Sequence, residues 1–156
     1  MSKTKYWLFK SEPNVFSFDD LLSSPRKTTC WDGVRNYQAR NIMRDEVKIG
    51  DVVLFYHSRV EPMCIAGTAE VTKEAYADPT QFDSNSKYFD DKATRDKPRW
   101  VAVDITAHQK FEKPLTREQL KSMPQLADMV LLKKGSRLSI QPVTEAEYRL
   151  ILAEAK

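Results

Sequence analysis

Short apolar runs recur along the chain, and they predict more strands than helices. The predicted strands share a high content of aromatic and β-branched residues. They cover residues 6–10, 28–31, 51–57, 65–71, 100–105 (extending as far as 111) and 138–140. Pro13 and Pro142 are expected to end the first and the last of them, because proline has no backbone N–H to donate to a neighbouring strand.

Helices are predicted where a capping residue precedes apolar positions spaced three and four apart. These segments are residues 17–22, 36–46, 116–123, 125–132 and 144–155. The last is the most clearly marked, because Thr144 is followed three positions later by Glu147, the pattern of a capping box. Strands outnumber helices and do not alternate regularly with them. The pattern therefore predicts an α+β fold built on a mainly antiparallel, curled sheet or small barrel.

Two segments depart from this regular pattern. Gly67 lies inside a predicted strand, where a glycine often allows another backbone or a ligand to come close. The polar stretch from Ala77 to Pro98 is longer than a routine connection. Loops of that length are usually either functional or mobile.

Length and composition narrow the class of protein. The 156 residues predict a single domain spanning 1–156, and the hydrophobic content of 41% is that of an ordinary globular protein. Lys and Arg total 25 against 22 Asp and Glu, so the net charge is +3. This excess permits nucleic acid as a partner and predicts weak non-specific binding to it.

Targeting and metal signals are weak. Trp7 to Phe9 is too short an apolar run for a signal peptide or a membrane span. Cys30 and Cys64 form no CxxC pair, and His57 and His108 have no spaced metal-ligating partner. We therefore expect no disulfide framework, metal, cofactor or membrane partner, and a cytoplasmic protein (nuclear in a eukaryote).

The densest set of candidate binding residues lies between residues 31 and 41. Trp31 and Tyr37 offer aromatic faces on which a base stacks, and Asn36 offers a paired donor and acceptor to a base edge. Arg35 and Arg40 are of the type that contacts phosphate. The same stretch is also compatible with a capped surface helix anchored by a tryptophan, and composition alone leaves both interpretations open.

Polar residues at predicted strand ends form a second set, because such positions often line the mouth of a pocket. They are Lys10, Ser11, Glu12, Tyr56, His57, Ser58, Arg59, Arg137 and Ser139. His57 is either an acid–base group or a structural residue, and Arg137 either holds a phosphate or forms a surface ion pair. A carboxylate pair of Glu12 and Asp32 is a weak signal, since a chain with 22 acidic residues offers many such pairs.

Several motifs in chain order resemble those of the EVE domain family over nearly the whole chain. They are WLFKSEP (7–13), WDGVRNYQARN (31–41), GD (50–51), FYHS (55–58), GTAEV (67–71), DPTQF (78–82), PRW (98–100) and SRLSIQP (136–142). The resemblance implies a PUA-like pseudobarrel related to YTH and ASCH domains. It also implies a non-catalytic reader of a modified base: 5-methylcytosine or 5-hydroxymethylcytosine in DNA, or an N6-methyladenine-type base in DNA or RNA.

The resemblance also implies which residues bind. Lys10, Ser11 and Trp31 look like pocket positions of YTH domains, whereas Glu12 replaces a polar residue there and favours a donor such as an exocyclic amine. The expected base pocket comprises Lys10, Ser11, Glu12, Trp31, Val34, Asn36, Tyr37, Tyr56, His57, Ser58 and Ser139, and the Gly67 strand is a second candidate beside Val34 for contacting the base methyl group. The expected phosphate-binding residues are Lys10, Arg35, Arg40 and Arg137.

Two other functions remain open at this stage. One is an enzyme that acts on a modified nucleotide or nucleic acid with Glu12, Asp32 or His57 as acid–base groups. The other is a general RNA-binding module of the PUA-like type. For the reader, Trp31→Ala is expected to abolish selective binding while leaving the fold intact. The oligomeric state is not predicted by the sequence.

Overall fold

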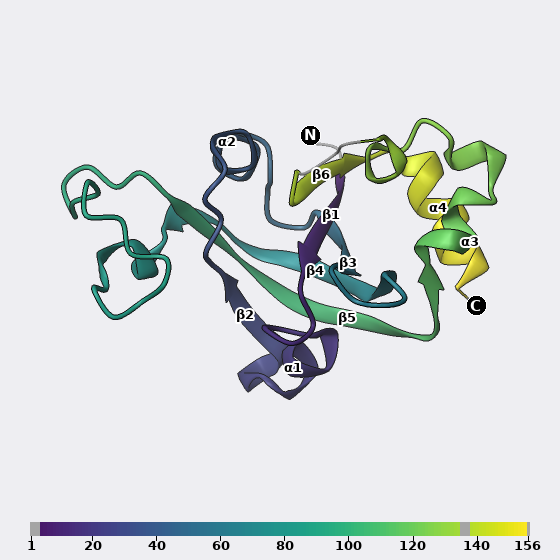
Figure 1. Ribbon diagram of the computed structural model, residues 1–156, viewed down its shortest axis with the longest axis horizontal. Helices are drawn as coiled ribbons and strands as arrows, with labels where there is room; N and C mark the ends of the chain where they lie inside the picture. The colour runs from purple at the N-terminus through teal and green to yellow at the C-terminus, as the bar shows by residue number, and fades with distance from the viewer. Residues whose placement is uncertain (1–3, 135–137, 156) are drawn as a thin grey trace.

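The computed structural model describes residues 4–134 and 138–155, so Arg137 lies outside the described residues. Its strands are β1 (Tyr6–Ser11), β2 (Thr28–Trp31), β3 (Val52–His57), β4 (Cys64–Ala77), β5 (Val101–Thr116) and β6 (Ile140–Val143). The α-helices are α1 (Phe18–Ser23), α2 (Tyr37–Asp45), α3 (Arg117–Lys121) and α4 (Glu145–Glu154). Short 3₁₀ turns are η1 (Pro25–Lys27), η2 (Pro79–Phe82), η3 (Pro124–Leu126) and η4 (Val130–Leu132). Figure 1 shows their arrangement.

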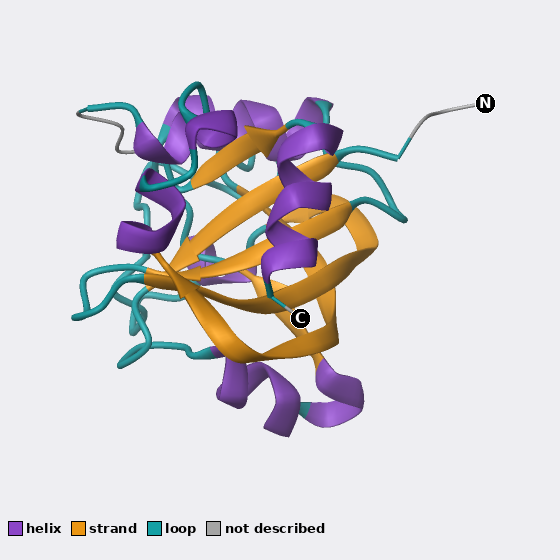
Figure 2. Ribbon diagram, turned by 90° about the vertical axis from the view of Figure 1, so that its right-hand side faces the viewer, coloured by secondary structure: helices purple, strands orange, loops and turns teal. Residues whose placement is uncertain are grey.

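The described strands form one sheet in the order β2-β5-β4-β3-β1-β6. β1 pairs in parallel with β3, and the other neighbouring strands pair antiparallel. The sheet curls strongly, with helices at its periphery (Figure 2). The predicted α+β fold with a mainly antiparallel, curled sheet is therefore confirmed.

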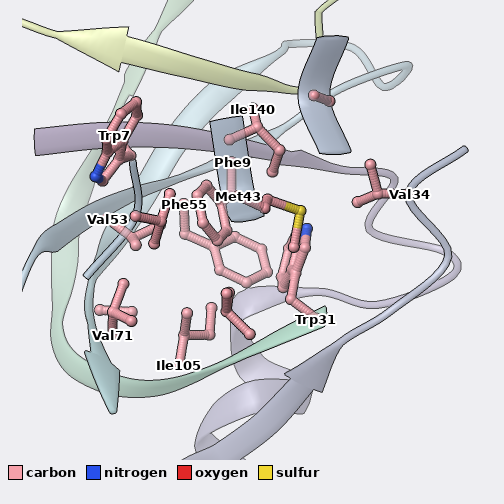
Figure 3. Close-up of a cluster of buried hydrophobic side chains, with 14 of the residues drawn as sticks. Trp7, Phe9, Trp31, Val34, Met43, Val53, Phe55, Val71, Ile105 and Ile140 are labelled. Atoms are coloured by element: carbon pink, nitrogen blue, oxygen red, sulfur yellow. The ribbon is translucent and has the colours of Figure 1, made fainter. Parts of the chain in front are cut away.

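Alternate residues of the central strands supply two hydrophobic cores, one on each face of the sheet. Trp7, Phe9 and Phe55 face the first core, which α1 and α2 help to cover (Figure 3). Leu8 and Leu54 face the second core, together with apolar residues of α3 and α4. Because both faces of β1 and β3 are packed, the ends of these strands are held in fixed positions.

Most predicted helix starts are confirmed. Ser17, Thr116 and Thr144 each form a capping box at the N-terminus of α1, α3 and α4. Asn36 caps α2, because its side-chain oxygen accepts a hydrogen bond from the backbone N–H of Ala39 at 2.9 Å.

Two predicted elements are wrong in detail. The helix expected over 125–132 is two 3₁₀ turns, in which Leu126, Met129 and Leu131 are buried at spacings shorter than a helical turn. The last strand begins at Ile140 and runs through Pro142 rather than ending there. β6 lies at the edge of the sheet, where the missing N–H of a proline can face away from the neighbouring strand.

Gly67 lies where the backbone of β5 and the ring of Phe18 come close to β4, and not where a ligand could bind. A Cβ atom at Gly67 would lie 2.5 Å from the carbonyl oxygen of Gln109 and 2.6 Å from the ring of Phe18. The space beside Gly67 is thus already filled, and the expectation that its strand accommodates a base methyl group is wrong.

We expect Gly67→Ala to lower the free energy of unfolding by about 1–3 kcal/mol, the usual cost of overpacking a core. The backbone of β5 has to move to admit the methyl group, because the nearest atom belongs to a backbone carbonyl. Urea unfolding followed by circular dichroism measures the change. An unaltered midpoint would show that the two strands separate more easily than this packing implies.

Candidate binding pocket at the strand ends

A pocket of about 1130 Å³ opens where β1, β2 and β3 end. β1 and β3 are parallel neighbours, so Ser11 and His57 end them at the same edge of the sheet. The pocket slightly exceeds the usual size range of small-molecule sites. Its lining comprises Lys10, Ser11, Glu12, Val15, Phe16, Thr29, Cys30, Trp31, Asp32, Gly33, Val34, Arg35, Ser58, Arg59, Met63, Lys87, Tyr88 and Ser139.

Trp31 supplies an aromatic wall that belongs partly to the core. It is the last residue of β2, is 8% exposed, and its ring centroid lies 5.3 Å from that of Phe9 and 5.4 Å from that of Phe55 (Figure 3). Its indole N–H has no hydrogen-bond acceptor among the described residues. A ligand in the pocket can therefore meet both an aromatic surface and an unused donor.

The end of β1 brings a cation and an anion to the pocket. Burial lowers the pKa of Lys10, and the charge of Arg117 lowers it further. No described carboxylate lies within ion-pair distance of Lys10, so its ammonium group is available to an anionic ligand. Glu12 lies 3.4 Å from Nε of Arg59, across the rim, and the hydroxyl of Ser11 donates to the carbonyl of Phe16 at 2.6 Å.

Asp32 and Cys30 follow at the end of β2. Burial raises the pKa of Asp32, and the nearby Asp78 raises it further. Burial also raises the pKa of the Cys30 thiol to about 11. At neutral pH Cys30 is therefore protonated, which makes it a poor nucleophile.

A network of hydrogen bonds around Asp78, here called the hub, fixes the part of the pocket wall that Gly33, Arg35 and Tyr88 form. The fully buried Asp78 accepts hydrogen bonds from the backbone N–H of Gly33 at 2.8 Å, from Arg35 at 3.0 Å and from both the N–H and the hydroxyl of Thr80. Arg35 also donates to the carbonyl oxygen of Tyr88 at 2.7 Å. The hub joins the turn after β2 to the long segment between β4 and β5, which extends to the left in Figure 1.

Tyr88 is a pocket residue that the sequence did not reveal. It lies in the long polar stretch already singled out, but nothing in its neighbours distinguishes it from other loop residues. Gly33 has a φ of +79°, and a Cβ atom there would lie 2.7 Å from the ring of Tyr88. Glycine at position 33 thus allows both the turn and the close packing of Tyr88 against it.

The pocket brings together most of the expected base-binding residues. Those in its lining are Lys10, Ser11, Glu12, Trp31, Val34, Ser58 and Ser139, and Arg35 also contributes. The guanidinium group of Arg35 binds protein oxygens, and its side chain is largely buried. Its place is therefore that of a support for the pocket wall.

Four expected residues lie elsewhere. Asn36 caps α2, and Tyr37 and Arg40 lie on the outer surface of that helix. Tyr56 is buried in the second core, and burial raises the pKa of its hydroxyl to about 12. None of the four is part of the pocket lining.

His57 also has a structural place. Its Nε2 atom accepts a hydrogen bond from the backbone N–H of Phe18 at 3.1 Å, at the start of α1. Burial lowers the pKa of the imidazole, which favours the neutral form that can accept this bond. The geometry thus agrees with the structural alternative considered for His57.

Metal and membrane features are lacking in the part of the chain that the structure describes. No group of three or more His, Cys, Asp or Glu side chains there could hold a metal ion. No described helix is both long and apolar enough to cross a bilayer. The single domain, the lack of a cofactor and the cytoplasmic location stay predictions.

Comparisons with known proteins place the chain in a family. The EVE domain model matches residues 5–154. The chain is 40% identical to thymocyte nuclear protein 1 of Homo sapiens over 167 residues, which cover 96% of this chain and 73% of that protein.

Solved structures agree with this match. A Pseudomonas putida protein has a TM-score of 0.92 and 45% identity, covering 97% of this chain and 99% of its own. Human THYN1 protein in complex with 5-methylcytosine-containing DNA has a TM-score of 0.90 and 39% identity, covering 98% of both chains. The ZmASCH protein of Zymomonas mobilis, at 12% identity and a TM-score of 0.56, shares the fold alone. The family model, the sequence identities and the fold together show that this chain belongs to the EVE domain family.

Proposed function

We propose that this chain is a non-catalytic module that binds a modified base of DNA, with 5-methylcytosine as the preferred base, in the pocket beside Trp31. The observation that carries the proposal is the solved complex of human THYN1 protein with 5-methylcytosine-containing DNA, at 39% identity over 98% of this chain. A shared fold does not by itself imply a shared ligand, so the pocket chemistry has to agree.

The pocket lining matches the features of a methylated cytosine. Trp31 offers an aromatic surface to the ring, and the apolar Val34 is suited to contact the methyl group. Glu12 and Asp32 offer oxygen acceptors to the exocyclic amine. Lys10, which also lines the pocket, offers a positive charge to the phosphate backbone of the bound DNA. A base in a duplex has to leave its stack to enter such a pocket, at a cost of a few kcal/mol.

The chemistry of the pocket favours binding over catalysis. The Cys30 thiol, with a pKa of about 11, is protonated near neutral pH. His57 is bound to the backbone of α1 and lies outside the pocket lining. Of the other two acid–base groups considered for an enzyme, Glu12 pairs with Arg59 at the pocket rim, and Asp32, whose pKa is raised by burial, has no ion-pair partner among the described residues.

A fluorescence anisotropy titration at one fixed salt concentration tests the proposal. The ligands are one short sequence, as DNA and as RNA, with cytosine, 5-methylcytosine, 5-hydroxymethylcytosine, adenine or N6-methyladenine at one position. We expect 5-methylcytosine DNA to bind at least tenfold more tightly than cytosine DNA, a difference of about 1.4 kcal/mol. Flat binding across the panel refutes the reader, and a new product detected by mass spectrometry refutes the non-catalytic assignment.

Val34 provides a sharper test within the same titration. Val34→Ala is expected to reduce the preference for 5-methylcytosine over cytosine by about fivefold, because roughly 1 kcal/mol of apolar contact with the methyl group is lost. Val15→Ala is the matched control, since Val15 also lines the pocket but is half exposed at its rim. Equal effects of the two substitutions would contradict the role assigned to Val34.

A further inference from the structure

An exposed aromatic residue at the start of α2 is surrounded by arginines. Tyr37 is 47% exposed, and its ring stacks on Trp100 with centroids 4.8 Å apart and planes 26° apart. The guanidinium carbon of Arg40 lies 4.7 Å from the centroid of the Tyr37 ring. Arg99 donates a hydrogen bond to the Tyr37 hydroxyl, and its guanidinium carbon lies 5.9 Å from the ring centroid. We call Tyr37, Arg40 and Arg99 the arginine shelf.

The arginines of the shelf are held in place without being fully neutralised. Arg40 donates to the side-chain oxygen of Asn41 and to the carbonyl oxygen of Arg99, which are both uncharged acceptors. Arg99 lies 3.6 Å from Asp90, the one acidic group that approaches the shelf among the described ion pairs. The nearby Asp45 already pairs with Arg44, so the two guanidinium groups of the shelf keep an excess of positive charge over Asp90, which favours an anion.

The geometry of the shelf suits a phosphate in particular. Contacts with the Tyr37 ring and with backbone and amide oxygens restrict the arginine side chains, so less conformational entropy is lost on binding. Guanidinium groups bind phosphate through paired hydrogen bonds, and two of the five N–H groups of Arg40 are still unused. Tyrosine and arginine side chains that stay partly accessible on a tryptophan support, as Tyr37 and Arg40 do on Trp100, are also typical of binding hot spots.

A continuous stack connects the shelf with the pocket. Trp100, on which Tyr37 stacks, has its ring centroid 5.2 Å from the guanidinium carbon of Arg35. Arg35 in turn lies 5.5 Å from the ring centroid of Tyr88, and both Arg35 and Tyr88 line the pocket. Trp100 therefore contacts both Tyr37 of the shelf and Arg35 of the pocket wall.

We propose that the arginine shelf binds a backbone phosphate of the DNA strand whose modified base occupies the pocket. The inference rests on the proposed function, because it takes that strand as the occupant. The shelf carries no information about the base. It should hold the strand with similar strength whether the base is modified or not.

The test measures the dependence of binding on salt. Arg40→Gln combined with Arg99→Gln is titrated with 5-methylcytosine DNA and cytosine DNA at several salt concentrations. We expect about tenfold weaker binding of both, and a slope of log K against log salt that is smaller by about 0.7–0.9, the contribution of one phosphate contact. The ratio of the two affinities should stay unchanged.

Two further variants serve as controls. Arg149→Gln with Lys121→Gln removes the same charge from exposed positions on α4 and α3, outside the pocket lining and the shelf, and should leave the slope unchanged. Arg40→Lys with Arg99→Lys keeps the charge and should recover most of the slope. Single Arg40→Gln extends the comparison if the double variant unfolds.

The outcomes separate the shelf from the pocket. An unchanged slope in the shelf variant overturns the phosphate site, even if the parent protein prefers 5-methylcytosine. A changed ratio between the two DNAs also overturns it, since the shelf would then recognise the base. If the shelf variant has a reduced slope but the parent protein binds the two DNAs equally well, the phosphate site is supported and the proposed selectivity for 5-methylcytosine is refuted. Tight binding of an acidic peptide instead of DNA would assign the shelf to a protein partner and overturn the proposal.

Discussion

Replacing Asp78 with asparagine is expected to lower the free energy of unfolding by about 3–5 kcal/mol, as when one partner of a buried ion pair is removed. Asp78 is fully buried and accepts hydrogen bonds from Gly33, Arg35 and Thr80. An asparagine side chain has one oxygen acceptor, and its NH₂ group would face donors that need an acceptor. The positive charge of Arg35 would also lose its counterion.

Urea unfolding followed by circular dichroism measures this loss. Asp128→Asn is the matched control, because it makes the same chemical change at an exposed position that forms no described ion pair. A loss below about 1 kcal/mol for Asp78→Asn would show that solvent readily replaces the hub. Asp78→Asn should also weaken DNA binding at temperatures where it stays folded, because the hub holds Tyr88 at the pocket wall.

Much of the fold is predictable because the decisive signals are local. Ser17, Thr116 and Thr144 mark helix starts by capping boxes, which depend on residues only three positions apart. The short strands β1 and β3 are packed on both faces, so they are recognisable as apolar runs.

The long strands were harder to predict. β4 runs to Ala77 and β5 to Thr116, well beyond the expected strands, which covered 65–71 and 100–105 with an extension to 111. Their outer parts are mostly exposed and polar, so no alternation of apolar residues marks them. Pairing with the neighbouring strand supports them instead, and that pairing joins residues up to about fifty positions apart.

The site was predictable where it coincides with strand ends and not where it depends on long-range contacts. Lys10, Ser11 and Glu12 were identified because polar residues follow an apolar strand. Tyr88 and Asp78 were not, since their importance arises from contact with Gly33 and Arg35, more than forty residues away for Asp78. Tyr37 was expected in the base pocket and Arg40 at a phosphate, but both lie on helix α2 outside the pocket lining.

Trp31→Ala is expected both to destabilise the protein and to remove selective binding. The side chain is 8% exposed and packs against Phe9, Phe55 and Phe16, so its loss leaves a cavity that costs about 3–5 kcal/mol. To the expectation from sequence that this substitution leaves the fold intact, the packing of Trp31 adds a large loss of stability. Total stabilities of small proteins are about 5–15 kcal/mol, so a folded but weakened protein is the expected state. Urea unfolding gives the loss, and the anisotropy titration gives the binding.

The effect on binding has to be separated from the effect on stability. Leu54→Ala is a suitable control, because Leu54 is fully buried in the second core, lies outside the pocket lining and is expected to cost about 2–5 kcal/mol. Both variants are titrated at a temperature where each is folded. We expect Leu54→Ala to keep the preference for 5-methylcytosine DNA and Trp31→Ala to lose it. Trp31→Phe should retain most of the packing while lacking the indole N–H donor. If Trp31→Ala prefers 5-methylcytosine DNA as strongly as Leu54→Ala does, Trp31 does not contact the base. The proposed base pocket is then wrong, although the role of Trp31 in the first core is unaffected.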